Sequence, residues 1–343
     1  LRSAKKIANF SLALSTIAFV VGQAPRATAL TFEFDYTYDT QGFFSGTEGS
    51  TRKATLEAAA SYFEPFTDNL AEIDAAAAGK TWIPKFTHPG TGQTNFKADG
   101  TGIPNNDFTN RVIAEDTILI FPGGYNLGGT QLGSAAPGGY TASESFIGDI
   151  VGRGQTGASD ESATDFALWG GAIAFNNTVT WNNSHTTSPG SGENDLLSTA
   201  IHELGHVLGI GFDGYTLAGS VDQTSTWESF VSGSDFTGPN SVAENSGNNV
   251  PLHTDLAHWD EDITSDITLN GSGSQEAAFD PDVLTGTRKL MTDLDYAGLA
   301  DVGWETAAVT AAVPFEFSPG LGIVLVSGFF GVKKVWHAVK NSQ

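Results

Sequence analysis

Regularly spaced apolar and polar residues predict several secondary-structure elements along this chain. Apolar and polar residues alternate over residues 30–38, which is typical of a half-buried strand. Residues 50–63 begin with Ser and Thr, are rich in alanine and end before Pro65, so they favour a helix. Short apolar runs at residues 117–121 and 171–175 predict two buried strands.

The strongest periodic signal predicts a helix that starts at Asn194 or Asp195. Its apolar residues recur at helical spacing and form one face: Leu197, Ile201, Leu204 and Leu208. Gly209 and Gly211 follow and would end the helix in a left-handed turn. The order of one helix, two strands and then this helix predicts an α+β domain with its cleft along the last helix.

Two long stretches lack such periodicity. Residues 123–139 are rich in glycine but lack the lysine and the spacing of a phosphate-binding loop, which predicts a plain surface loop. Residues 214–250 are rich in Gly, Ser, Asn and Asp and indicate an irregular insertion.

The chain is strongly acidic, with 39 acidic residues, 16 basic residues and a formal charge of −23. Basic residues at the two ends make the centre more acidic still. Such a surface repels nucleic acid, which we exclude as a partner. It suits an extracellular protein and could hold Ca²⁺, for example at Asp160, Glu161 and Asp165, although a solvated acidic loop is the favoured interpretation of these three. The absence of cysteine excludes disulfides and thiolate metal ligands.

Residues 1–29 have the pattern of a secretory signal peptide. Two lysines precede an apolar segment over residues 7–21, and the Ala-Thr-Ala sequence at 27–29 fits the small-x-small cleavage rule. The apolar segment is shorter than the roughly 20 residues of a membrane-spanning helix. We therefore expect an exported protein whose mature chain begins near Leu30.

The last thirty residues contain a second targeting pattern. A Pro-Phe-Glu-Phe motif at residues 314–317 precedes an apolar run over 321–332 and then two lysines. This arrangement resembles the bacterial C-terminal sorting signals of the PEP-CTERM type, with Pro-Phe-Glu-Phe in place of Pro-Glu-Pro. The resemblance implies processing or anchoring at the cell envelope, with residues 313–343 contacting the membrane or the sorting machinery. An ordinary membrane tail is the alternative and predicts a similar location.

The motif His202-Glu203-Leu204-Gly205-His206 carries the candidate chemistry. Positions i and i+4 of a helix share one face, so two imidazoles placed there could grip one Zn²⁺ ion. Glu203 could then reach a water molecule on the open side of the metal, which is the equipment of a zinc peptidase. A core helix that happens to carry two histidines is the alternative interpretation.

This motif and Gly209 together resemble the metzincin zinc peptidases. The short metzincin motif continues to a third histidine or aspartate three residues after the glycine, but here Phe212 occupies that position and Asp213 follows one residue late. Relatives similar to leishmanolysin place the third histidine after a long insertion, commonly before a tryptophan. That resemblance implies His258, which precedes Trp259, as the third ligand.

Alternatives for the third ligand stay open at this point. His253 lies in the same segment as His258, Asp213 follows the short motif, and a gluzincin-like site would use Glu228 instead. Met291 is the only methionine of the chain. Metzincins place a methionine in a tight turn beneath the zinc site, so the resemblance implies that role for Met291, and a core methionine is the alternative.

The resemblance covers roughly residues 165–304 and also implies the architecture around the site. It implies a metzincin-like catalytic domain with a twisted mixed sheet, a central metal-binding helix and a C-terminal subdomain after that helix. An edge strand upstream of the helix would hold an extended peptide by backbone pairing. The resemblance assigns this role to one strand: Gly171, Ala172, Ile173, Ala174 and Phe175.

The predicted organisation is a signal peptide over residues 1–29, a zinc metallopeptidase domain over 30–312 and a sorting segment over 313–343. We expect an exported zinc-dependent endopeptidase that acts on peptide or protein substrates, with Glu203 as general base. The competing hypothesis is a non-enzymatic cell-envelope or adhesion protein on a degenerate peptidase scaffold. Phe212 favours the competing hypothesis, whereas the intact Glu203 favours the enzyme.

Overall fold

The computed structural model of the chain describes residues 30–66, 70–94, 96–97, 108–153, 169–211, 227–269 and 271–305. The predicted signal peptide and sorting segment lie outside these ranges, as do Phe212, Asp213 and the candidate calcium residues at 160–165. Within the described ranges, no helix is long and apolar enough to cross a membrane.

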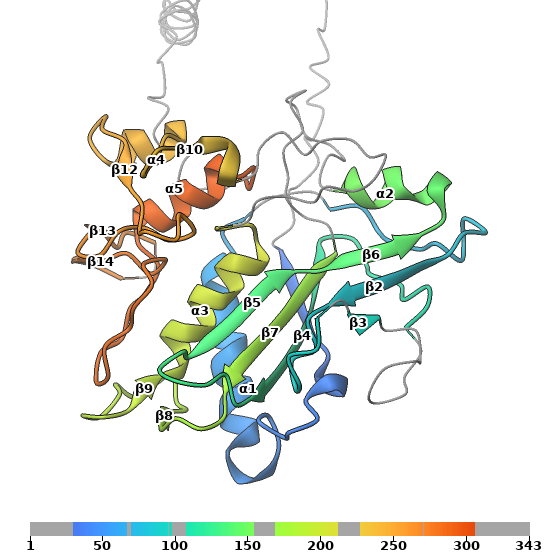
Figure 1. Cartoon of the computed structure of the whole chain (residues 1–343), viewed down its shortest axis with the longest axis horizontal. Coiled ribbons are helices and arrows are strands. Elements are labelled where there is room, and N and C mark those ends of the chain that lie inside the picture. The colour runs from blue at the N-terminus through green and yellow to red at the C-terminus, as the bar shows by residue number, and fades with distance from the viewer. Residues whose placement is uncertain are drawn as a thin grey trace, which may run out of the picture.

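A four-stranded mixed sheet forms the centre of the fold, in the order β1-β4-β7-β5 (Figure 1). β1 (Thr31–Phe34), β4 (Thr117–Tyr125) and β7 (Gly170–Asn176) run parallel, and β5 (Gly133–Pro137) pairs antiparallel with β7. The α+β class and the mixed sheet that we expected are therefore confirmed.

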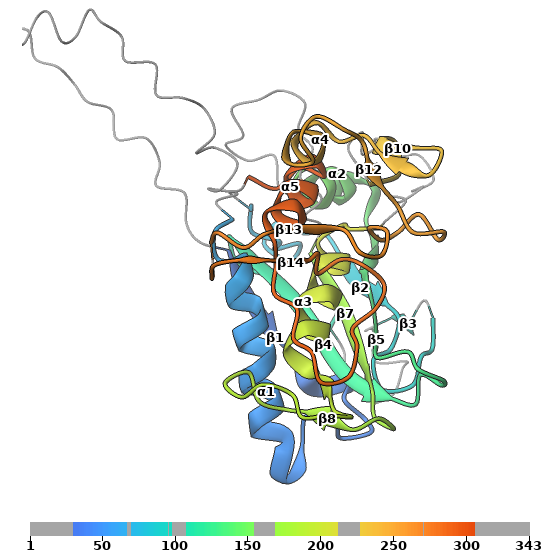
Figure 2. The ribbon, with the colours of Figure 1, turned by 90° about the vertical axis from the view of Figure 1, so that its left-hand side faces the viewer.

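Two helices cover one face of this sheet. α1 (Gly46–Ala60), which continues into the 3-10 turn η2 (Ser61–Phe63), packs against α3 (Leu196–Val207). Figure 2 shows both helices on the same side of the strands. Ile118 and Ile120 of β4 belong to the core beneath these helices, whereas the residues that alternate with them belong to a second core on the opposite face.

A three-stranded sheet contributes to this second core. Its order is β3-β2-β6, with β2 (Trp82–Phe86), β3 (Phe96–Lys97) and β6 (Gly139–Ala142). Phe86 stacks on Phe121 of β4 with ring centroids 4.5 Å apart. β4 is therefore buried on both faces, which explains its nearly unbroken run of apolar residues.

Short elements complete the fold. Those before α3 are η1 (Tyr36–Tyr38), η3 (Glu144–Phe146), α2 (Ile147–Val151), β8 (Trp181–Asn182) and β9 (Asn194–Asp195). Those after α3 are η5 (Trp227–Phe230), β10 (Val231–Ser232), β11 (Asp235–Phe236), α4 (Pro239–Glu244), β12 (Val250–Pro251), β13 (Thr264–Asp266), β14 (Ser274–Glu276) and α5 (Asp293–Asp301). Within the predicted irregular insertion, residues 227–250 contain only short elements of this kind, and the remainder of the insertion lies outside the described ranges.

Two predictions about the central sheet are also wrong. Residues 123–139, predicted as a surface loop, contain the end of β4 and all of β5. Glycine occurs there because backbone and side chains approach closely: a Cβ on Gly124 would lie 2.7 Å from Cβ of Phe43. Residues 171–175, predicted as the edge strand, belong to β7, which pairs with strands on both sides. Their continuous apolar run is typical of an interior strand, and β5 forms the edge of the sheet on this side.

Candidate metal centre

α3 brings two histidines of the motif together. Asp195 caps the first turn by accepting a hydrogen bond from the Ser198 amide at 3.1 Å, and Gly209, with a φ of 109°, follows the last turn. The predicted apolar face is buried: Leu197, Ile201, Leu204 and Leu208. The imidazoles of His202 and His206 lie beside this face, with their Nε2 atoms 3.0 Å apart.

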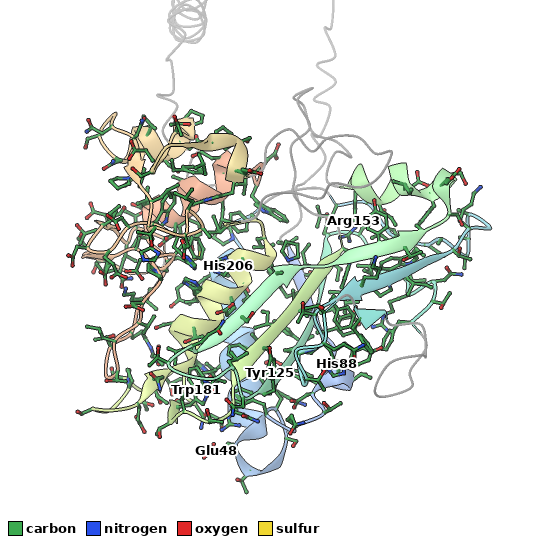
Figure 3. All side chains as sticks on the ribbon, in the orientation of Figure 1. Glu48, His88, Tyr125, Arg153, Trp181 and His206 are labelled. Carbon is green, nitrogen blue, oxygen red and sulfur yellow. The ribbon has the colours of Figure 1, made fainter. Side chains whose placement is uncertain are left out.

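His258 approaches this pair from the C-terminal part of the chain. It lies in the turn between β12 and β13, and its Nε2 is 3.1 Å from Nε2 of His206. Figure 3 shows His206 near the end of α3 that faces the C-terminal elements. The ligand atoms of His202, His206 and His258 all lie within 4.8 Å of one another, so they could hold one metal ion.

An oxygen atom stands behind each of the three imidazoles. Nδ1 lies close to these acceptors: Ala278 O for His202 (2.8 Å), Ile210 O for His206 (2.9 Å) and Asp255 Oδ2 for His258 (2.8 Å). A carbonyl or carboxylate oxygen only accepts, so Nδ1 must carry the proton and donate it. The lone pair of each ring is then on Nε2, the atom directed at the shared site.

Burial keeps the two helix histidines uncharged. It lowers the pKa of His206 to about 4, and the neighbouring His258 contributes to this decrease. It also lowers the pKa of His202 well below its ordinary value, with further contributions from His206 and His258. At neutral pH both imidazoles are therefore in the neutral form that a metal ion requires.

Glu203 lies between the helix histidines in the sequence and is only 5% exposed. Burial raises the pKa of its carboxyl to about 8, and Oε2 has no hydrogen-bond partner among the described residues. Gly133 of β5 passes against this carboxyl so closely that a Cβ there would collide with Oε1. The absence of a side chain at Gly133 therefore makes room for Glu203.

The histidines and Glu203 line a cleft of about 810 Å³. Residues 130–135, which include the start of β5, form one wall, and residues 281–285 form the other. β5 is the last strand of its sheet, and no described strand pairs with its outer side. On the opposite wall the apolar side chain of Leu284 is 71% exposed. An extended peptide could therefore lie along the cleft and pair with β5.

None of the other described candidate ligands belongs to the group formed by the three histidines. Nδ1 of His253 is 3.2 Å from Oδ2 of Asp255, and these two residues form a second potential metal group with His258. Glu228 is exposed on η5 and belongs to none of the potential metal groups found among the described residues. Asp213 lies outside the described ranges.

The segment that contains Met291 is connected to the site through Asp295. Met291 is 1% exposed and belongs to the same core as α3. The buried Asp295 carboxylate accepts hydrogen bonds from the amide of Thr292 at 2.7 Å, the amide of Ala278 at 2.8 Å and Nε1 of Trp259 at 3.1 Å. Ala278 supports the first histidine of α3, and Trp259 follows the third histidine, so one carboxylate joins three segments around the site.

The sequence analysis did not identify three of these residues, which are Asp295, Asp255 and Gly133. Asp295 follows Thr292 at the spacing of a capping box, which the structure contains, so that pattern could have revealed it. Asp255 precedes the third histidine by three residues, but this spacing has meaning only once the turn is known. Gly133 carries no signal, because its requirement arises from the approach of a distant side chain.

A third potential metal group consists of Glu261, Glu276 and Asp280. Lys289 already occupies this group, with Nζ 2.6 Å from Oε2 of Glu276, in an ion pair with Asp280, and 2.6 Å from the carbonyl of Asp282. The ammonium thus supplies the positive charge that these carboxylates need, and the histidine group remains the stronger candidate for a metal ion.

No protein-family model, curated protein or solved structure matches this chain. The interpretation of the cleft therefore depends on its own geometry. That geometry comprises three imidazoles with converging Nε2 atoms, a buried carboxyl beside them and a strand along one wall whose outer edge pairs with no described strand.

Proposed function

We propose that this chain is a zinc-dependent endopeptidase of the metzincin type. His202, His206 and His258 would hold the metal, and Glu203 would act as general base. The observation that carries this proposal is the convergence of three Nε2 atoms beside a buried carboxyl in an open cleft.

The donor set fits zinc. Three imidazoles whose Nε2 atoms converge suit Zn²⁺, whereas Ca²⁺ and Mg²⁺ prefer oxygen ligands. Three protein ligands on one side of a cleft also leave a coordination position open, as a catalytic zinc site requires. When bound, zinc would lower the pKa of a water molecule and polarise the carbonyl of the scissile peptide bond.

Glu203 would transfer the proton in this reaction. Its carboxyl is protonated near neutral pH while it is buried without a cation, because burial raises its pKa to about 8. Positive charge beside it favours the carboxylate form, which can accept a proton from water. The same carboxyl would then pass the proton to the leaving amine.

β5 would position the substrate. Its free edge offers backbone amides and carbonyls to an extended peptide, and residues 281–285 would confine the peptide from the other side. This assignment replaces the strand at residues 171–175, whose two edges are already paired. The buried Met291 would support the site from the core that it shares with α3. Export to the cell envelope, predicted from residues 1–29 and 313–343, completes the proposal.

Casein cleavage by the purified full chain, with zinc supplied, tests this function. Glu203→Gln should abolish cleavage and retain zinc, whereas Glu228→Gln, a matched change at an exposed position, should leave cleavage unchanged. Zinc content should be measured for all three proteins. A protein that binds zinc at the histidines but cleaves nothing would instead favour the non-enzymatic envelope protein.

A further inference from the structure

A compact turn presents the third histidine to the site. The carbonyl of His258 accepts a hydrogen bond from the amide of His253 at 3.0 Å, and the carbonyl of His253 accepts one from the amide of Leu256 at 2.9 Å. Leu256 adopts a left-handed conformation with a φ of 61°, which is uncommon for a residue other than glycine. Nε1 of Trp227 fixes the carbonyl of Leu256 at 2.8 Å. The turn is thus held in a strained shape by its surroundings.

The Asp255 carboxylate lies inside this turn and uses both of its oxygens. Oδ1 accepts a hydrogen bond from the amide of Ala257 at 2.9 Å, and Oδ2 accepts one from Nδ1 of His258 at 2.8 Å. Nδ1 of His253 lies 3.2 Å from the same Oδ2, in contact but without the alignment of a hydrogen bond. The amide bond fixes the carboxylate, and the fixed carboxylate in turn fixes the ring of His258.

Asp255 differs from the groups that support the other two histidines. His202 and His206 donate to main-chain carbonyls, which carry no net charge. His258 donates to a carboxylate, so the third imidazole has a full negative charge behind it. A carboxylate in that position selects the tautomer with a free Nε2 lone pair and makes that nitrogen a stronger donor.

We propose that Asp255 is a positioning residue for the metal centre, which holds the imidazole of His258 in the orientation and tautomer that bind the ion. This inference rests on the proposed metal site but not on peptidase activity. The third histidine stands on a turn rather than on a helix, and Asp255 supplies the order that a helix would otherwise supply.

Zinc affinity of the full chain, measured by competition with a chromophoric chelator, tests this role. Asp255→Asn keeps the shape of the side chain but removes its charge, and it should weaken zinc binding roughly 10-fold. Asp255→Ala also leaves the amide of Ala257 without its acceptor and should weaken binding by up to about 100-fold. Asp266→Asn, which removes an exposed charge on β13, is the matched control and should bind zinc as the unaltered chain does.

A second readout separates positioning from a general structural role. Nitrogen chemical shifts of the His258 ring in the metal-free chain should show the proton on Nδ1, and Asp255→Ala should shift the tautomer population toward Nε2–H. Equal zinc affinities for Asp255→Asn, Asp255→Ala and Asp266→Asn, within about twofold, would overturn the role of Asp255 alone. A chain that binds no zinc in any form would overturn the metal centre and this inference together.

Discussion

Two regions of the molecule contribute to the histidine site, and they hold their residues by different means. Residues 30–211 form the sheet and the two long helices, and α3 supplies two histidines from successive turns of one helix. Residues 227–305 contain only short elements and supply His258 from a turn. In that turn the position of the ring depends on Asp255 and on the nearby side chain of Trp227.

This difference predicts which part of the site tolerates substitutions and which part does not. Backbone hydrogen bonds within α3 set the spacing of its histidines whatever the surrounding side chains are. The turn around His258 depends on a few polar side chains, and Asp295 ties it to the segment behind α3 and to the segment that contains Met291. Substitutions of single polar residues should therefore disturb the C-terminal region more than the helical one.

Removal of a histidine should have the largest effect on zinc binding, because each of the two regions supplies ligands to the site. We expect His206→Ala and His258→Ala each to weaken zinc binding by more than about 100-fold, because each removes a ligand rather than a supporting group. His253→Ala, in the same turn, is the control and should have a much smaller effect. If His253→Ala were as harmful as His258→Ala, the third ligand would be wrongly assigned.

Removal of Asp295 should lower the stability of the folded protein, because its carboxylate joins segments of the C-terminal region. Its carboxylate is buried and accepts hydrogen bonds from three main-chain amides, Trp259 Nε1 and the Thr292 hydroxyl. Asp295→Ala leaves these donors without an acceptor and should lower the free energy of unfolding by about 3 kcal/mol. Urea unfolding of the full chain measures this, with the exposed Asp266→Ala as control. Similar losses in both variants would show that Asp295 does not join the segments.

In the helical region, the buried carboxyl of Glu203 should make the stability of the protein depend on pH. Its pKa in the folded protein is about 8, above the ordinary value of 4.5. Between these values the folded state binds more protons than the unfolded state, so stability is highest at low pH and declines as the pH rises toward 8. Glu203→Gln removes this dependence, so the metal-free variant should gain about 3 to 4 kcal/mol relative to the unaltered chain from about pH 5 to 8.

Parallel urea titrations with a chelator present would measure this gain. The exposed Glu228→Gln should show the same pH dependence as the unaltered chain. A constant difference between Glu203→Gln and the unaltered chain across this pH range would mean that the Glu203 carboxyl is not buried as described.

The smallest effect concerns the contact between β5 and α3. Gly133→Ala would push a methyl group against Oε1 of Glu203 and should lower kcat/KM for casein-derived peptides roughly 10-fold by displacing the base. Zinc affinity should stay unchanged, because the histidines are not touched. Gly148→Ala is the matched control: Gly148 lies on α2, where an added Cβ would meet no atom within 4 Å, so both quantities should stay unaltered. A fall in zinc affinity with Gly133→Ala would indicate that β5 and the metal ligands are coupled.

Much of the helical region could be predicted from local patterns. The apolar stripe from Leu197 to Leu208 predicted α3, and the asparagine–aspartate pair before it marked the observed cap. Strand β4 was found as far as Phe121, although it continues to Tyr125 through glycines that carry no hydrophobic signal. Sheet order could not be predicted, because an apolar run at β7 and the small residues of β5 say nothing of which strand lies at the edge.

The sequence by itself determined the separation of His202, Glu203 and His206, since helical geometry is a local property of the backbone. Only the tertiary structure decided that His258, rather than His253 or Glu228, lies beside them, because that contact spans 52 residues and depends on how the turn packs. The sequence likewise could not predict which carbonyls support the helix histidines, since every residue has a carbonyl and only packing selects the ones that are used. Nor could it predict the free edge of β5, since only the pairing of the strands decides which edge stays free.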